Sequence, residues 1–243
     1  MIERILEPEV MDTVEDASEY DAMDHREANL AFVERLEALG ARGSMLDIGT
    51  GPGHIPLLVC ERIQEARVLG IDLAERMLEL ARRHRAASPH AERLEFRRAD
   101  AKGLDFADDS FDTVFSNTIL HHIPDPLPFL REAARVLRPT GCLLIRDLFR
   151  PRTEEELERL VALHAAEATP YQRRLFADSL HAALTPDELR ELARAAGLAS
   201  AEVTVDSDRH MSLQQPYGVS PFPPLSPPST FLPPLSPRDG GGK

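Results

Sequence analysis

Short apolar runs alternate with helix-like segments over about residues 20–213, and this alternation limits the possible folds more than any other feature of the chain. The strand candidates are residues 44–48, 67–71, 93–98, 111–116 and 142–148. The segments between them have apolar residues at helical spacing, and one opens with an Asp-Pro pair, which is typical of a helix start. Such alternation implies parallel βαβ units with right-handed crossovers.

Two further short strand candidates, residues 201–205 and 209–213, follow the last predicted helix and lie close enough to pair as a hairpin. Parallel strands are buried on both sides, so helices must cover both faces of the sheet. The sequence therefore predicts an α/β fold with a doubly wound, mostly parallel sheet and a C-terminal antiparallel hairpin at one edge. Ligands of such sheets bind beyond the carboxyl ends of the strands.

Composition divides the chain into three parts. Residues 1–40 are expected to form an N-terminal helical cap segment, and residues 41–213 the main domain, with a helical substrate cover at about 150–197. Residues 214–243 hold nine of the 20 prolines and contain PPLSP twice. Proline blocks helices and central strands, so we expect a disordered tail there. A protein partner with an aromatic groove can bind such a tail, and a solvated extension without a role is the alternative.

Charge and cysteine content exclude several classes of protein. The chain carries 41 acidic and 28 basic residues, a net charge of −13, which disfavours nucleic acid and anionic membranes as partners. Two cysteines cannot form a disulfide framework or a cysteine-rich zinc site. The chain has no run of 18 apolar residues, so no membrane-spanning helix is expected. The acidic N-terminus does not fit a signal peptide. The expected location is therefore cytoplasmic.

The strongest motif is the loop Gly49-Thr50-Gly51-Pro52-Gly53, which follows the first strand candidate and precedes a helix. Glycines permit unusual backbone angles and let a ligand lie against bare main chain. The dinucleotide fingerprint requires a third glycine where His54 stands, and the P-loop lysine is absent. The loop therefore favours a nucleoside-like ligand without a pyrophosphate, and a nicotinamide-dependent dehydrogenase is disfavoured.

Polar residues also follow the next three strands. Asp72 closes the second strand, where a carboxylate can accept both hydroxyls of a ribose. Asp100 and Ala101 follow the third strand, where a base edge can be bound, and Asn117 follows the fourth. The alternatives are structural: an aspartate after a strand can cap the next helix, and Asp100 or Asn117 can be ordinary turn residues.

The chain resembles the class I S-adenosylmethionine (SAM)-dependent methyltransferases of the small-molecule type, similar to the ubiquinone/menaquinone-biosynthesis enzymes. The matching stretches are LDIGTGPGHIP, GIDLAERMLELA, FRRADAKGLDFADDSFDTVFSNTILHHIPDP and REAARVLRPTGCLLIRDL, in family order over roughly residues 42–148. The resemblance implies a Rossmann-like fold, with residues 41–213 as the SAM-binding domain.

The resemblance also implies a role for each matching position. The glycine loop would pass under the methionine part of SAM, with Asp47 fixing the loop near the amino group. Asp72 would hold the ribose and Asp100 the adenine amino group, while the N-terminal Tyr20 would close over the site. The complete predicted cofactor set is Tyr20, Asp47, Gly49, Thr50, Gly51, Gly53, Asp72, Leu73, Asp100, Ala101 and Asn117.

The pair His121-His122 suggests catalysis, since a histidine can act as a general base toward an acidic C–H, O–H or N–H group. His122 is the predicted catalytic residue, and one member of such a pair usually has a structural role. The two histidines with Asp125 do not predict a metal site, because no third ligand lies nearby in the sequence.

The predicted function is methyl transfer from SAM to a small-molecule acceptor by in-line displacement. The N/D-P-P-[YF] motif of many amino-group and adenine methyltransferases is absent after the fourth strand, which further disfavours nucleic acid. Two alternatives remain: a SAM-binding enzyme of another class, such as a lyase or a carboxy-SAM-forming enzyme, and a non-catalytic SAM-binding scaffold recruited through its proline-rich tail. The sequence does not identify the acceptor or the oligomeric state.

Overall fold

The computed structural model describes residues 2–7 and 26–219. Seven strands form one sheet in the order β3-β2-β1-β4-β5-β7-β6. The strands are β1 Ser44–Ile48, β2 Arg67–Asp72, β3 Leu94–Arg98, β4 Phe111–Asn117, β5 Leu137–Leu148, β6 Glu202–Val205 and β7 His210–Gln215. The helices are α2 Arg26–Ala38, α3 His54–Arg62, α4 Glu75–Ala87, α5 Pro126–Val136, α6 Glu154–His164, α7 Pro170–Ala182 and α8 Pro186–Ala195, with the short 3₁₀ turns η1 Ala91–Arg93 and η2 Leu120–His122.

Strands β1 to β5 pair in parallel, and β7 is antiparallel to both β5 and β6. This arrangement confirms the predicted doubly wound sheet with an antiparallel hairpin at one edge. No helix in the two described ranges is long and apolar enough to span a membrane.

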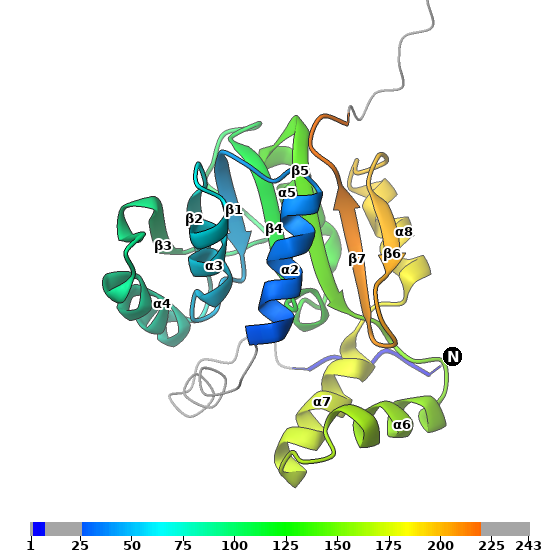
Figure 1. Ribbon diagram of the computed structural model, residues 1–243. Helices are drawn as coiled ribbons and strands as arrows, with labels where there is room; N and C mark the ends of the chain where they lie inside the picture. The colour runs from blue at the N-terminus through cyan, green and yellow to red at the C-terminus, as the bar shows by residue number, and fades with distance from the viewer. Residues whose placement is uncertain (1, 8–25, 220–243) are drawn as a thin grey trace, which may run out of the picture.

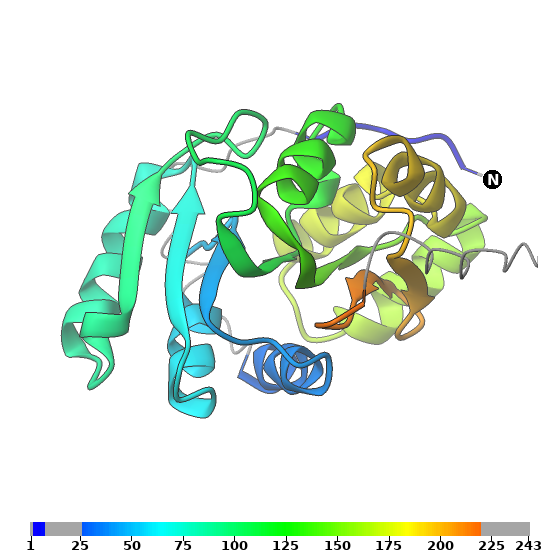
Figure 2. The same cartoon turned by 90° about the horizontal axis from the view of Figure 1, so that it is seen from above.

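Side chains of the central strands alternate between two apolar cores, one on each face of the sheet. On β1, Met45 joins the core formed with α2, α3 and α4, whereas Leu46 and Ile48 join the core formed with α5 and α8. Figure 2 shows α2 and α3 below the sheet and α5 and α8 above it. Burial on both faces explains why these strands are continuous apolar runs rather than alternating ones.

The strand order reverses between β1 and β4, which are neighbours in the sheet. After β1 the chain turns to α3 on one face, and after β4 it reaches α5 on the other. The two connections diverge, so a crevice opens at the carboxyl ends of β1 and β4.

Helices α6 and α7 lie beyond the carboxyl ends of the parallel strands, and residues 2–7 run across the same end (Figure 1). A small apolar core joins these parts: Leu157 and Leu160 of α6 pack with Leu180 of α7 and with Ile2. The segment predicted as a helical substrate cover, about residues 150–197, holds α6, α7 and α8.

The end of the domain lies further along the chain than the sequence suggested. β7 continues through Gln214 and Gln215, which we had assigned to the tail. Both side chains are buried and form hydrogen bonds: Arg35 donates to Gln214, and Gln215 donates to the carbonyl of Gly141. Residues 220–243, with both PPLSP segments, lie outside the described residues, as does Tyr20.

Side chains cap the starts of two helices. Thr185 accepts a hydrogen bond from the Glu188 N–H, while the Glu188 carboxylate accepts one from the Thr185 N–H, which forms a capping box at the start of α8. Asp125 caps α5 through the Leu127 N–H. These caps satisfy N–H groups that a helix leaves without partners.

We predict that Gly70→Ala destabilises the sheet, because β2 packs closely against the glycine loop at this position. A Cβ atom on Gly70 would lie 2.5 Å from the Thr50 hydroxyl oxygen and 2.7 Å from a Phe96 ring carbon. Overpacking of this kind costs about 1–3 kcal/mol of unfolding free energy, which urea denaturation measures. Gly103→Ala is the matched control, since a Cβ there meets nothing within 4 Å. Equal stability of the two variants would contradict the prediction.

Candidate active site

A cleft of about 870 Å³, open to solvent, lies at the point where the strand order reverses. Residues that follow β1, β2, β3 and β4 line it, together with Met77 of α4. Its walls are largely apolar, and polar groups stand at defined places along it. Apolar walls with a few polar groups at defined places are typical of a small-molecule site.

Three glycines give the loop after β1 its shape. Gly49, Gly51 and Gly53 all have positive φ angles, of 77°, 52° and 81°. Residues with a Cβ rarely adopt such angles, which explains the glycine spacing in the sequence. The N–H groups of Gly49 and Thr50 donate to the Ile71 carbonyl at 2.8 and 2.9 Å and tie the loop to β2.

Asp72, at the end of β2, holds the same loop from the other side. Its Oδ2 accepts a hydrogen bond from the Gly51 N–H at 2.8 Å, and its Oδ1 accepts one from the Ala74 N–H at 2.9 Å. Asp72 therefore has the structural role of fixing the glycine loop. Asp72 also lines the cleft.

Asp100 stands at the adjacent end of the cleft, after β3. Its Oδ1 accepts from the Lys102 N–H at 2.9 Å and lies 3.1 Å from the Lys102 ammonium. Partial burial alone would raise the pKa of Asp100, but these Lys102 contacts outweigh it and lower that pKa. Asp100 is therefore an ionised acceptor beside the apolar side chains of Leu73 and Met77.

Asp47 lies behind the glycine loop and is not among the residues that line the cleft. The side chain is 2% exposed. Burial raises the pKa of Asp47 to about 7, the neighbouring Asp72 charge adds to the rise, and the Thr50 hydroxyl opposes it. The Asp47 carboxyl group therefore contacts the glycine loop on its buried side, through Thr50.

The opposite end of the cleft is formed by the segment after β4. Asn117, Thr118, Ile119 and His122 all line it. Thr118 has a φ angle of 58°, which is strained for a β-branched residue, and its N–H donates to the Arg146 carbonyl at 2.8 Å. Strain of this kind clusters at functional sites, where the surrounding structure maintains it.

Asp147 at the end of β5 is buried, contacts η2 and is not among the residues that line the cleft. It accepts from the main-chain N–H groups of Leu120 at 2.5 Å and His121 at 3.2 Å, and lies 2.5 Å from His121 Nδ1. Burial alone would lower the pKa of His121, but Asp147 and Glu7 outweigh it and raise that pKa.

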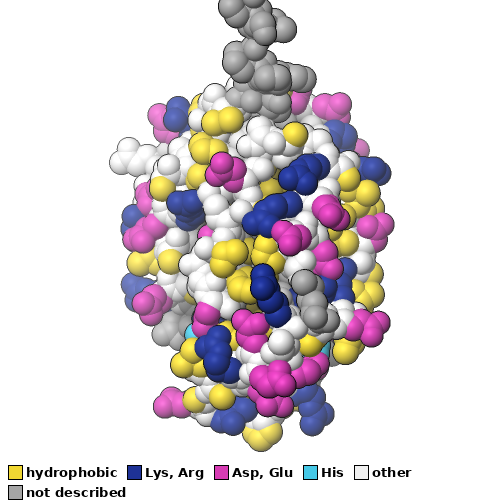
Figure 3. Space-filling view, turned by 90° about the vertical axis from the view of Figure 1, so that its right-hand side faces the viewer, with side chains coloured by type: hydrophobic (Ala, Val, Ile, Leu, Met, Phe, Trp, Pro, Cys, Tyr) yellow, Lys and Arg dark blue, Asp and Glu magenta, His cyan; other side chains and the backbone are white. Residues whose placement is uncertain are grey.

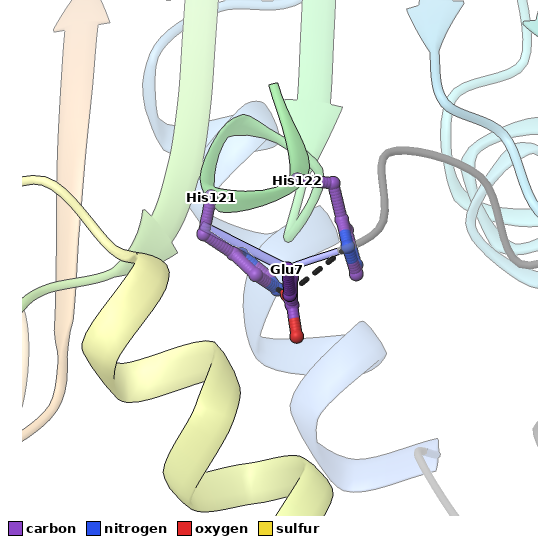
Figure 4. Close-up of side chains that lie close together, drawn as sticks. All are labelled: Glu7, His121 and His122. Carbon is purple, nitrogen blue, oxygen red and sulfur yellow. Dashed lines mark ion pairs between the residues drawn. The ribbon is translucent and has the colours of Figure 1, made fainter. Parts of the chain in front are cut away.

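Glu7, from the N-terminal segment, lies beside both histidines (Figure 4). Its Oε1 is 3.4 Å from His121 Nε2 and 3.0 Å from His122 Nδ1. The sequence analysis missed Glu7 because nothing local links it to the pair, and it also missed Lys102 and Thr118.

The structure therefore brings most of the predicted site residues to one cleft. Those that line it are Gly49, Gly51, Asp72, Leu73, Asp100, Ala101, Asn117 and His122. Thr50 and Gly53 are buried in the loop behind it, with Asp47. Tyr20 lies outside the described residues.

Residues 46–145 match the family described as Methyltransferase domain. This span holds the glycine loop, Asp72, Asp100 and η2. This span is a class I SAM-dependent methyltransferase domain. It is 37% identical over 124 residues to the 27-O-demethylrifamycin SV methyltransferase of Amycolatopsis mediterranei, covering 50% of this chain and 45% of the relative. It is 34% identical over 111 residues to the ubiquinone/menaquinone biosynthesis C-methyltransferase of Geotalea daltonii, covering 45% and 47%.

The methyltransferase fold also matches solved structures. A SAM-dependent methyltransferase from Aquifex aeolicus superimposes with a TM-score of 0.61 at 18% identity, over 84% of this chain and 98% of that one. A Haemonchus contortus phosphoethanolamine N-methyltransferase in complex with SAM gives a TM-score of 0.60 at 23% identity, over 79% and 43%. The chain spans about half the length of the first curated relatives it matches.

We predict that Asp47 makes the methyltransferase domain less stable as pH rises. An unfolded aspartate titrates near pH 4, whereas the pKa of folded Asp47 is about 7. The folded state therefore binds more protons between these values, so stability falls as pH rises from about 4 to 7.

Asp47→Asn removes this titration, so the stability difference between the variant and the wild type should grow across that window, by on the order of 4 kcal/mol. Urea denaturation at pH 4.5, 6 and 8 measures it. Parallel pH profiles of the two proteins would contradict the assignment.

Proposed function

We propose that this chain transfers the methyl group of SAM to a small-molecule acceptor. One observation carries the proposal: the glycine loop, Asp72 and Asp100 lie in order along one cleft, with His122 at its far end. A SAM molecule has the same order of chemical groups, with a charged amino acid, a ribose and a base.

The residues of the cleft fit such a ligand. Gly49 and Gly51 present bare main chain where the methionine part would lie. Asp72, which lines the cleft at the end of β2, would accept hydrogen bonds from the ribose hydroxyls. Asp100 would accept from the adenine amino group, with Leu73 and Ala101 against the ring. We assign Asp47, Thr50 and Gly53 to the shape of the loop.

The donor supplies a methyl group on a positively charged sulfur, which is already activated for displacement. The protein therefore needs mainly to orient the acceptor in line with the carbon–sulfur bond and to exclude water. The carboxylates around the cleft favour a cationic donor. The rigid attachment of the loop to β2 through the Ile71 carbonyl keeps the donor in one position.

His122 is the proposed catalytic residue because it lines the end of the cleft opposite Asp100. A histidine there acts on the acceptor in one of two ways. It takes a proton from an O–H, N–H or acidic C–H group directly, or it holds an ion that lowers the pKa of that group.

A small molecule is the proposed acceptor for two reasons. First, the chain is strongly acidic, with a net charge of −13, which disfavours nucleic acid as the acceptor. On the face over β6 and α8, acidic and basic side chains are interspersed (Figure 3). Second, the relatives named above act on rifamycin and quinone precursors according to their names. A lyase or a carboxy-SAM-forming enzyme would be expected to place a basic side chain beside the methyl group of SAM. Lys102 lines the cleft, but its ammonium group pairs with Asp100, which disfavours these alternatives.

We predict that His122→Ala lowers kcat by about 10²–10⁴-fold while leaving the affinity for S-adenosylhomocysteine (SAH) within about twofold. The residue would act on the acceptor rather than on the donor. The assay follows SAH formation from SAM with a panel of quinol, phenol, macrolactone and amine acceptors.

His164→Ala is the control, because His164 pairs with Asp208 at 2.8 Å away from the cleft. Unchanged turnover in His122→Ala would remove His122 from the mechanism. SAM consumption without methyl transfer to any acceptor would favour another SAM-dependent chemistry.

A further inference from the structure

Three side chains with metal-binding atoms meet at the acceptor end of the cleft. Oxygen and nitrogen atoms of Glu7, His121 and His122 lie within 4.8 Å of one another. In Figure 4 both imidazoles project from η2 toward the Glu7 carboxylate. The sequence analysis expected no metal site because it found no third ligand near the histidines. Glu7 supplies one from the N-terminal segment.

Two of the three separations are close to those between ligands of one ion, and the third is no more than 4.8 Å. Zn²⁺ bonds to imidazole nitrogen and carboxylate oxygen are about 2.0–2.2 Å long, so two ligands of a tetrahedral ion lie about 3.3–3.5 Å apart. The Glu7 oxygen is 3.4 Å from His121 Nε2 and 3.0 Å from His122 Nδ1.

Hydrogen bonding alone does not account for the His122 nitrogen. His122 Nδ1 is buried and, within the described part of the chain, forms no hydrogen bond of acceptable geometry, although Glu7 is 3.0 Å away. A buried polar atom without a partner costs about 1–3 kcal/mol. A metal ion between His122 Nδ1 and the Glu7 carboxylate oxygen would be coordinated by both atoms.

The groups behind the three side chains hold them in position. Asp147 contacts His121 Nδ1 at 2.5 Å, which leaves Nε2 toward Glu7. This carboxylate–histidine arrangement recurs behind metal-binding imidazoles and fixes their orientation. Arg4 anchors the Glu7 segment by donating to the carbonyls of Ala182 at 2.7 Å and Ile123 at 3.0 Å.

We propose that Glu7, His121 Nε2 and His122 Nδ1 bind one divalent transition-metal ion of the Zn²⁺ type. Two imidazoles and one carboxylate form a donor set that suits such ions, in contrast to the all-oxygen sites of Mg²⁺ or Ca²⁺. Three protein ligands leave a coordination position open, as in catalytic zinc sites.

The methyl acceptor is the expected ligand at the open coordination position of the ion. His122 belongs both to the three-residue cluster and to the lining of the cleft, so an ion on it lies next to the acceptor's place. Such an ion would hold an oxygen atom of the acceptor, which points to hydroxyl or enol acceptors. This last step rests on the proposed function, whereas metal binding itself does not.

The test is calorimetric titration of the metal-free full-length chain with ZnCl₂, with SAH binding measured on the same samples. We expect one equivalent of Zn²⁺ per chain with a Kd of micromolar or below. Glu7→Gln should weaken this binding at least tenfold, and Asp147→Asn by about 10–100-fold, as for other residues behind metal ligands. His164→Gln is the matched control, because it alters another histidine–carboxylate pair outside the site.

Absence of Zn²⁺ binding by the wild type, or equal binding by Glu7→Gln, would overturn the proposal and leave the cluster as a hydrogen-bonded ion pair. Glu7 is in the N-terminal segment outside the sheet, so its variant should remain folded, which retained SAH binding checks. SAH binding without Zn²⁺ binding would reject the metal site alone. A wild-type protein that does not bind SAH would instead reject the proposed function.

Discussion

The pairing of β1 with β4 is the constraint on which the rest of the structure depends. The chain leaves β1 toward one face of the sheet and leaves β4 toward the other, so the two connections cannot close over their common edge. The resulting crevice is where the glycine loop and the segment after β4 meet. Asp72 and Asp100 reach the cleft because β2 and β3 end at the same edge of the sheet.

Carboxylates, two of them buried, hold the loops that follow these strands. Asp72 binds the main chain of Gly51, and Asp147 binds the turn that carries both histidines. Asp47 lies beneath the glycine loop, where burial raises its pKa to about 7. Burying such groups costs stability, and they are retained where they orient main-chain N–H groups or a ligand. Structural and functional roles of these aspartates therefore coincide.

Much of the fold and half of the site followed from local sequence. The strand runs, the glycine positions and the Thr185–Glu188 capping box each depend on residues a few positions apart, so their patterns are visible without a structure. The approach of Glu7 to His122 depends instead on how the N-terminal segment crosses the sheet edge, which no spacing encodes. The continuation of β7 through Gln215 was missed because buried glutamines are unusual in a strand unless partners satisfy them.

The account depends most directly on donor binding, so calorimetric titration of the wild type with SAH is the decisive measurement. It predicts one site per chain with micromolar affinity, and a loss of at least tenfold in Asp72→Asn, since a hydrogen bond to a charged group contributes about 1.5–3 kcal/mol. Asp105→Asn, an exposed aspartate that does not line the cleft, should bind as the wild type does. A folded wild-type protein that does not bind SAH would contradict the central claim.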